Sequence, residues 1–127
     1  MEKEFVPYTE ALALKELGFN ELSPTFYSEK GFLYRCIDFY GYSTDKLYPN
    51  ECPVPTFSQA FRWFREKYRL KGEIDTADMI WSKWSFNIEL KGSSYILYSG
   101  LTEKIYFNTY EEAELECLKK LIEIVKQ

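Results

Sequence analysis

The stretch from Pro55 to Lys71, which reads PTFSQAFRWFREKYRLK, limits the possible folds of this chain most strongly. Thr56 is placed to cap the start of a helix, and Gln59 stands three residues further on, where a capping-box partner belongs. With about 100° of rotation per residue, five apolar side chains fall on one narrow face of that helix. They are Phe57, Ala60, Phe61, Phe64 and Tyr68. A face with four aromatic rings must be buried, so the sequence predicts a core built around this helix.

The same helix is expected to carry a basic face beside its aromatic face. Arg62, Arg65 and Arg69 fall together on it, and the whole chain has only four arginines. A guanidinium group offers a planar fork of donors to phosphates and carboxylates, so these arginines are the first candidate for a ligand site. The alternative is a solvated face in which Glu66 pairs with Arg62. Trp63 lies off the core face and is expected either to stack beside a ligand or to pack under the preceding loop.

Apolar periodicity and turn residues predict one α+β domain over residues 1–127, with residues 1–6 as a frayed tail. Helices are expected over residues 9–17, 55–71 and from 109 to the end, and strands over residues 25–28, 32–39, 84–90, 95–98 and 104–107. The domain would hold an antiparallel sheet of about five short strands, a hairpin plus a three-stranded meander, covered by three helices. Thr9 is placed to cap the first helix, and Gly18 is placed to end it in the left-handed conformation.

Residues 40–54 show no periodicity and contain Pro49 and Pro53, so they are expected to form an irregular loop. Connections of this length are uncommon in compact domains and are often functional. Tyr40, Tyr42 and Tyr48 lie in this loop, and tyrosine is typical of binding loops because its stiff ring gives contact area at low entropy cost. These tyrosines are therefore candidate binding residues. The alternative is an irregular cover over the core with the rings packed inward.

The last helix contains a carboxylate in an unusual position. The helix is expected to begin at Thr109, which forms a capping box with Glu112, and to bury a wide apolar stripe. Glu114 falls inside that stripe. A carboxylate there needs a partner or must reach solvent, and Arg65 would provide a partner if the two helices were neighbours. Glu114 is therefore a candidate buried or paired carboxylate, with a catalytic role as the alternative.

Several classes of chemistry are excluded or unsupported by the residues present. The chain has no histidine, which removes Ser-His-Asp and Cys-His catalysis and every zinc site that contains histidine. The acidic pairs Glu111 with Glu114 and Asp75 with Asp78 lack a third ligand at a recognisable spacing. Glycines are scattered, so there is no phosphate-binding loop. We therefore expect no catalytic residue set, no metal site and no cofactor.

Charge and cysteine content indicate the compartment and the partners to expect. The net charge of -4 gives no reason to expect nucleic acid as a ligand. Cys36, Cys52 and Cys117 form no pairwise motif, which is typical of free thiols in a reducing compartment. The amino terminus has acids where a signal peptide has positive charge, and no segment approaches the roughly 20 apolar residues of a membrane span. The sequence therefore predicts a soluble cytoplasmic protein with no membrane partner.

Two segments resemble a known group of proteins. CPVPTFSQAFRWFREKY (Cys52–Tyr68) and NTYEEAELECLKKLIEIVK (Asn108–Lys126) are similar to small uncharacterised proteins encoded by phages and prophages of gut bacteria. The resemblance implies an origin in a phage or another mobile element, and hence the cytoplasm of a host cell. It implies no activity and no site residue, because no function is established for the group.

The aromatic content favours binding as the function. Phe, Tyr and Trp make up 19% of the chain, more than a core of this size usually holds, so some rings should be exposed, as in binding surfaces. We therefore expect a non-enzymatic binding protein whose partner is another protein or a second copy in a homodimer. One alternative is an anti-defence sponge for a phosphate-containing nucleotide signal, with the arginines as clamp and Trp63 or a loop tyrosine as stacking plate. Another is a small enzyme that uses Glu114 or the aspartate pair.

Overall fold

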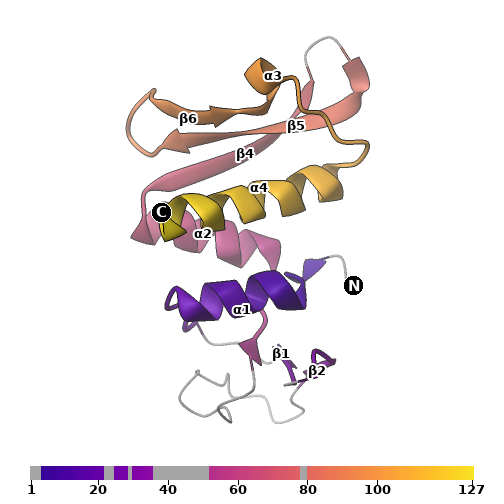
Figure 1. The fold of residues 1–127 in the computed structure, drawn as a ribbon, viewed down its shortest axis with the longest axis vertical. Coiled ribbons are helices and arrows are strands. Elements are labelled where there is room, and N and C mark those ends of the chain that lie inside the picture. Colours follow the sequence, from indigo (N-terminus) through magenta and orange to yellow (C-terminus); the bar gives the residue numbers. More distant parts are fainter. Residues whose placement is uncertain (1–3, 22–24, 29, 36–51, 78–79) are drawn as a thin grey trace. The chain divides into compact units, whose positions relative to one another are not determined.

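The computed structural model describes residues 4–21, 25–28, 30–35, 52–77 and 80–127 (Figure 1). The expected α+β class is confirmed: this part of the chain holds four helices and, with one two-residue strand, six strands in two antiparallel sheets. The chain divides into two compact units, Met1–Ser58 and Gln59–Gln127, and each is described by itself below. The assignment of residues 1–127 to one domain stays a prediction.

The first unit contains one helix and a small sheet. Its elements are α1 (Tyr8–Glu16), β1 (Thr25–Tyr27), β2 (Leu33–Arg35) and β3 (Cys52–Pro53), with the strands in the order β2-β1-β3. The predicted hairpin is confirmed by the antiparallel pairing of β1 with β2. Gly31 adopts a positive φ of 83° in the turn, and its N–H donates to the carbonyl of Ser28 at 2.9 Å. Glycine adopts this conformation without strain, which explains its place in the turn.

The start of the described chain belongs to this unit. Phe5 forms an antiparallel bridge with Thr56, and the N–H of Val6 donates to the carbonyl of Pro55 at 3.0 Å. Val6 is completely buried, and its carbonyl accepts a hydrogen bond from the hydroxyl of Tyr27 at 2.8 Å. Residues 4–6 are therefore part of the fold, against the expectation of a frayed tail up to residue 6.

The end of the expected loop over residues 40–54 is also ordered. Cys52 and Pro53 form β3, which pairs with β1, and the N–H of Val54 donates to the carbonyl of Thr25 at 3.0 Å. Cys52 and Val54 are buried, and burial raises the pKa of the Cys52 thiol to about 11, against a smaller opposite effect of Lys15. Residues 52–54 are thus a strand and its continuation instead of loop, because their apolar side chains fill the core of this unit.

Helix α1 ends at Gly18 as predicted but begins one residue earlier than predicted, at Tyr8. Pro7 occupies the N-cap position and makes no side-chain capping bond, so the expectation that Thr9 caps this helix is wrong. Gly18 has a positive φ of 102°, and the N–H of Phe19 donates to the carbonyl of Leu14 at 2.9 Å. This is the hydrogen-bond pattern of a Schellman C-cap, and buried Phe19 supplies the apolar contact that accompanies it.

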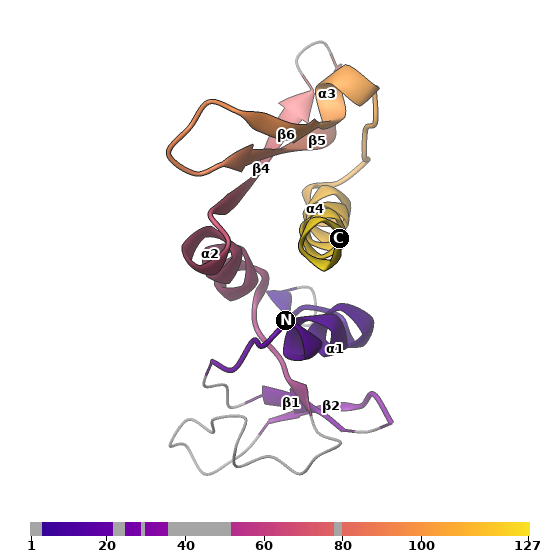
Figure 2. The same cartoon turned by 60° about the vertical axis from the view of Figure 1, so that its left-hand side comes forward.

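The second unit is a three-stranded meander packed on a helix. Its elements are α2 (Phe57–Lys67), β4 (Leu70–Ala77), β5 (Ile80–Leu90), β6 (Ile96–Ser99), α3 (Gly100–Glu103) and α4 (Tyr110–Lys126). The boundary between the two units falls inside α2, after Ser58. The strands lie in the order β4-β5-β6, and both neighbouring pairs are antiparallel. Figure 1 shows α4 running along the sheet, and Figure 2 shows the same helix nearly end-on beside the sheet.

The meander differs from the prediction in its choice of strands. Residues 104–107, the expected third strand, contribute only one bridge, between Trp84 and Phe107. The third strand is instead β4, which lies on the other side of β5. The predicted helix extends through Lys71 and so overlaps the start of this strand at Leu70. In the structure α2 ends at Lys67, and Arg69 adopts a left-handed φ of 57°, which turns the chain directly into β4.

The last helix agrees closely with the prediction. The hydroxyl of Thr109 accepts a hydrogen bond from the N–H of Glu112 at 3.1 Å, as expected for the cap. The carboxylate of Glu112 reaches back one residue further than a simple capping box and accepts from the N–H of Asn108 at 3.4 Å. The buried residues of α4 are Ala113, Cys117, Leu118, Leu121 and Ile122.

Gly72 marks a close approach between α4 and the sheet. A Cβ at this position would lie 2.8 Å from Cys117 Sγ and 3.4 Å from both Leu121 Cδ1 and Phe61 Cε1. Real Cβ atoms essentially never come as close as 2.8 Å to such an atom, so only glycine allows the helix to lie at this distance. Burial raises the pKa of the Cys117 thiol well above its ordinary value, as expected for an inert core cysteine.

We expect Gly72→Ala to destabilise the protein by about 1–3 kcal/mol, because the added methyl group overpacks the contact with Cys117 Sγ. Cys117→Ala removes the clashing sulfur. The double variant should therefore lose less stability than the sum of the losses in the two single variants. Urea unfolding of the four proteins measures this coupling. If the change in the free energy of unfolding of the double variant equals the sum of the single changes within about 0.5 kcal/mol, this contact is not the reason for glycine at position 72.

Candidate functional site

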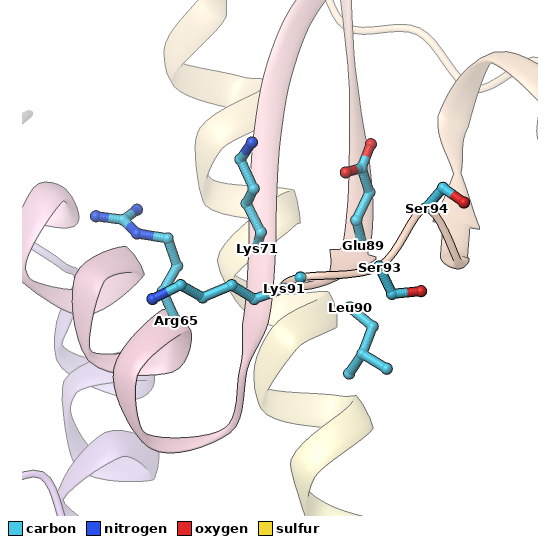
Figure 3. A pocket seen from close by; sticks show the side chains of 8 residues that line it. Arg65, Lys71, Glu89, Leu90, Lys91, Ser93 and Ser94 are labelled. Atoms are coloured by element: carbon cyan, nitrogen blue, oxygen red, sulfur yellow. The ribbon is translucent and has the colours of Figure 1, made fainter.

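An open groove lies beside the turn between β5 and β6 (Figure 3). Its volume is about 650 Å³. The residues that line it come from α2, the start of β4, the end of β5 and the following turn. They are Arg65, Lys71, Glu89, Leu90, Lys91, Gly92, Ser93 and Ser94. We call this site the basic groove, because three of its side chains are cationic and one is acidic.

The cations of the basic groove differ in how they are neutralised. Lys71 donates to Glu73 Oε1 at 2.7 Å, and this hydrogen bond raises the pKa of the Lys71 ammonium. Glu89 acts in the same direction, whereas the charge of Arg65 acts against it. Among the described residues, neither Arg65 nor Lys91 has a carboxylate within ion-pair distance. The groove therefore has an uncompensated positive charge around Arg65 and Lys91.

The junction between α2 and β4 brings these side chains together. The left-handed turn at Arg69 places the last turn of α2 next to the first residues of β4. The N–H of Lys91 donates to the carbonyl of Arg69 at 2.7 Å, which fixes the end of β5 at the same place. Figure 3 shows Lys71 and Glu89 projecting to the same side, Leu90 projecting to the opposite side, and Lys91 extending toward Arg65.

The turn that closes the groove is held by its own hydrogen bonds. Gly92 has a positive φ of 83°, and the N–H of Ser93 donates to the carbonyl of Leu90 at 3.2 Å. The Ser93 hydroxyl accepts from the N–H of Tyr95 at 3.0 Å, and the N–H of Leu90 donates to the carbonyl of Tyr95 at 3.0 Å. This turn joins the strands predicted over residues 84–90 and 95–98, and it presents Ser93 and Ser94 to the groove.

The three arginines assigned to one helical face do not all belong to the helix in the structure. Arg65 lines the basic groove, and Arg62 is exposed on α2. Arg69 is no longer helical, because α2 ends at Lys67 and the backbone of Arg69 is left-handed. The prediction of a single helical face is therefore wrong for Arg69, whereas Arg62 and Arg65 remain three residues apart on α2. Lys71 and Lys91, which accompany Arg65 instead, were missed because their approach depends on β4.

Trp63 does not lie off the core face as the sequence suggested. Its side chain is only 7% exposed. The indole packs edge-on against Phe64 and Tyr68, with ring centroids 5.2 and 5.4 Å apart, and the ammonium of Lys67 lies 5.0 Å from its centroid. Trp63 therefore stabilises α2 and does not line the basic groove.

The other aromatic candidates cannot be placed against this groove. Tyr40, Tyr42 and Tyr48, the candidate binding residues of the expected loop, lie outside the described residues.

The tip of the β5–β6 hairpin exposes a group of apolar side chains that the sequence analysis treated as ordinary strand residues. Their exposed fractions are 39% for Leu90, 63% for Tyr95, 51% for Ile96 and 42% for Leu97. The run Tyr95-Ile96-Leu97-Tyr98 does not alternate between apolar and polar residues, and in a short strand that bounds a sheet this pattern signals apolar side chains on both faces. We refer to Tyr95, Ile96 and Leu97 as the apolar tip.

Glu114 is half-buried on α4, as its place in the apolar stripe indicated. Burial raises the pKa of its carboxyl group, and the negative charge of Glu111 raises it further. The expected pair with Arg65 does not form, because Arg65 lies in the basic groove, and no other described residue forms an ion pair with Glu114.

Of the pair Asp75 and Asp78, the second residue lies outside the described residues. No group of three or more potential metal ligands occurs among the described residues.

The raised pKa of Glu114 predicts a pH-dependent gain in stability on replacement. An acid whose pKa is higher in the folded than in the unfolded state destabilises the fold once the pH exceeds the unfolded value of 4.5. Glu114→Gln should therefore raise Tm near pH 7, and the gain should disappear near pH 4. Glu123→Gln, on the exposed side of α4 where Glu123 pairs with Lys120 at 3.4 Å, is the control and should give no gain. An equal gain from Glu114→Gln at both pH values would contradict this origin.

Comparison of the chain with protein-family models, with curated proteins and with solved structures finds no match. In the described part of the chain, none of the helices is both long and apolar enough to cross a membrane.

Proposed function

We propose that this chain is a non-enzymatic binding module and that a protein partner docks on the tip of its β5–β6 hairpin. The observation that carries this proposal is the apolar tip, three consecutive exposed apolar residues at the start of β6 and just before it. Exposed apolar side chains grouped in this way are typical of protein-binding surfaces, and Tyr95 adds a stiff ring with a polar end.

The position of the apolar tip supports a protein as its occupant. In the described part of the chain β6 pairs with β5 alone, so its other side is not covered by a strand. The exposed side chains belong to the end of a hairpin, whereas small-molecule sites are usually concave and enclosed. A protein surface or an extended segment can cover such a hairpin and exclude water from it.

The two alternative functions have weaker support. A nucleotide sponge needs an aromatic plate, and the residues that line the basic groove include none; Trp63 is buried elsewhere. An enzyme that uses Glu114 would need a second catalytic group, and the carboxylate lies on α4 away from the groove lining. We also propose a phage or mobile-element origin, which is supported by the resemblance of Cys52–Tyr68 and Asn108–Lys126. A location in the cytoplasm of the host cell would follow from that origin.

Selection of binding peptides from a random displayed library on the wild-type protein tests this proposal. Peptides selected on the wild type should lose at least about tenfold in affinity on Ile96→Asp, because a charge is then placed in the buried centre of the interface. The matched control is Ile105→Asp, which alters a side chain of similar exposure outside the hairpin and should change affinity by less than about twofold. Circular dichroism confirms that both variants are folded.

Peptides that bind Ile96→Asp as tightly as the wild type would overturn the proposal, as would the absence of any selected peptide. Analytical ultracentrifugation of the wild type and of Ile96→Asp measures whether the chain forms a homodimer. A wild-type dimer that becomes a monomer on Ile96→Asp would identify a second copy of this chain as the occupant and would overturn a different protein as the partner.

A further inference from the structure

We infer that the partner docks through an extended acidic segment whose carboxylates bind Arg65 and Lys91 in the basic groove. This inference rests on the proposed function, because it names the chemistry of the segment that continues from the apolar tip into the groove.

The charge of the basic groove favours an acidic segment. Arg65 and Lys91 line the same groove, and among the described residues neither has a carboxylate within ion-pair distance. The chain as a whole carries a net charge of -4, so an acidic partner would not be attracted by its overall field. The attraction must therefore be local, between carboxylates of the partner and these two side chains, and it should weaken as salt is added.

The basic groove is continuous with the apolar tip. In the register of the sheet Lys71 pairs with Glu89, and Glu89 pairs with Ile96. Residues that lie directly opposite each other in an antiparallel pair share a face of the sheet. Lys71 and Glu89 therefore share the face opposite to Gly72, where α4 packs, and Ile96 is the neighbour of Glu89 on β6, next to a register shift between Ile88 and Glu89; we refer to these three positions as the row. A segment bound on Ile96 can continue along this row into the groove without crossing α4.

The length of this row suits a short piece of extended chain. Neighbouring strands are about 4.8 Å apart, so the row from Ile96 to Lys71 spans about 10 Å. An extended chain covers about 3.3 Å per residue, so about three residues bridge the row. An apolar residue of the partner on Ile96 would thus place acidic residues about three positions along the chain near Arg65 and Lys91.

The basic groove has mixed polarity. Besides its cations the groove contains the carboxylate of Glu89 and the hydroxyls of Ser93 and Ser94. A peptide segment offers backbone N–H donors to Glu89 and the serines as well as carboxylates to the cations. A polyphosphate offers acceptors and negative charge, but it has no backbone N–H groups to donate to Glu89 and the serines. The groove therefore fits an acidic peptide better than a nucleotide.

Fluorescence anisotropy with two defined peptides tests the inference. The first probe is a labelled ten-residue peptide with three valines followed by four glutamates, and its twin has four lysines in place of the glutamates. The wild type should bind the glutamate probe at least about tenfold more tightly than the lysine twin at low salt. The variant Arg65→Glu/Lys91→Glu should lose or reverse this preference. The control Lys119→Glu/Lys126→Glu makes the same change in net charge on α4 and should keep the preference.

The other outcomes test two claims separately, the acidic segment in the basic groove and the docking of a partner on the apolar tip. Equal binding of both probes that is lost in Ile96→Asp would overturn the acidic segment and leave docking on the apolar tip standing. Preference for the glutamate probe that persists in Arg65→Glu/Lys91→Glu would also overturn the inference, as would the failure of the wild type to bind either probe. ATP that binds more tightly than the glutamate probe and is lost in that double variant would assign the groove to a phosphate ligand. Glutamate-probe binding unaffected by Ile96→Asp would contradict the proposed function alone.

Discussion

The close approach of α4 to β4 at Gly72 determines what the second unit can present to a partner. Because residue 72 has no Cβ, Cys117 and Leu121 pack directly on the sheet, and α4 covers the face that carries Gly72 and Ile88. Side chains alternate between faces along a strand, so Lys71 and Glu89 must lie on the other face. The polar and charged face is thus a direct consequence of the tight helix contact on the opposite side.

A second constraint, at the α2–β4 junction, determines where positive charge collects. The left-handed backbone of Arg69 joins helix to strand without a loop, and the bond from the Lys91 N–H to the Arg69 carbonyl holds the end of β5 there. Arg65 in the last turns of α2 therefore lines one groove with Lys71 and Lys91, whereas Arg69 lies outside the helix. The basic groove and the apolar tip then share one end of the sheet, which is why both are assigned to the same partner.

Features that depend on local chemistry were predictable from the sequence, whereas those that depend on long-range packing were not. The end of α1 at Gly18, the β1–β2 hairpin and the Thr109 cap each follow from a few neighbouring residues, and all three are confirmed. The strand β4 was missed because the helical period of α2 continues through Lys71 in the sequence. The burial of Trp63 and the grouping of Arg65 with Lys91 depend on tertiary contacts that no local pattern encodes.

The central claim is that one continuous surface, from the apolar tip to the basic groove, receives the partner while α4 does not. The most direct measurement is an NMR titration of the labelled protein with the valine–glutamate probe, followed through the backbone amide shifts. The account predicts that the largest changes fall on residues 89–97, Lys71 and Arg65, with little change along the exposed side of α4. Changes concentrated on α4, or confined to the groove without the apolar tip, would contradict it.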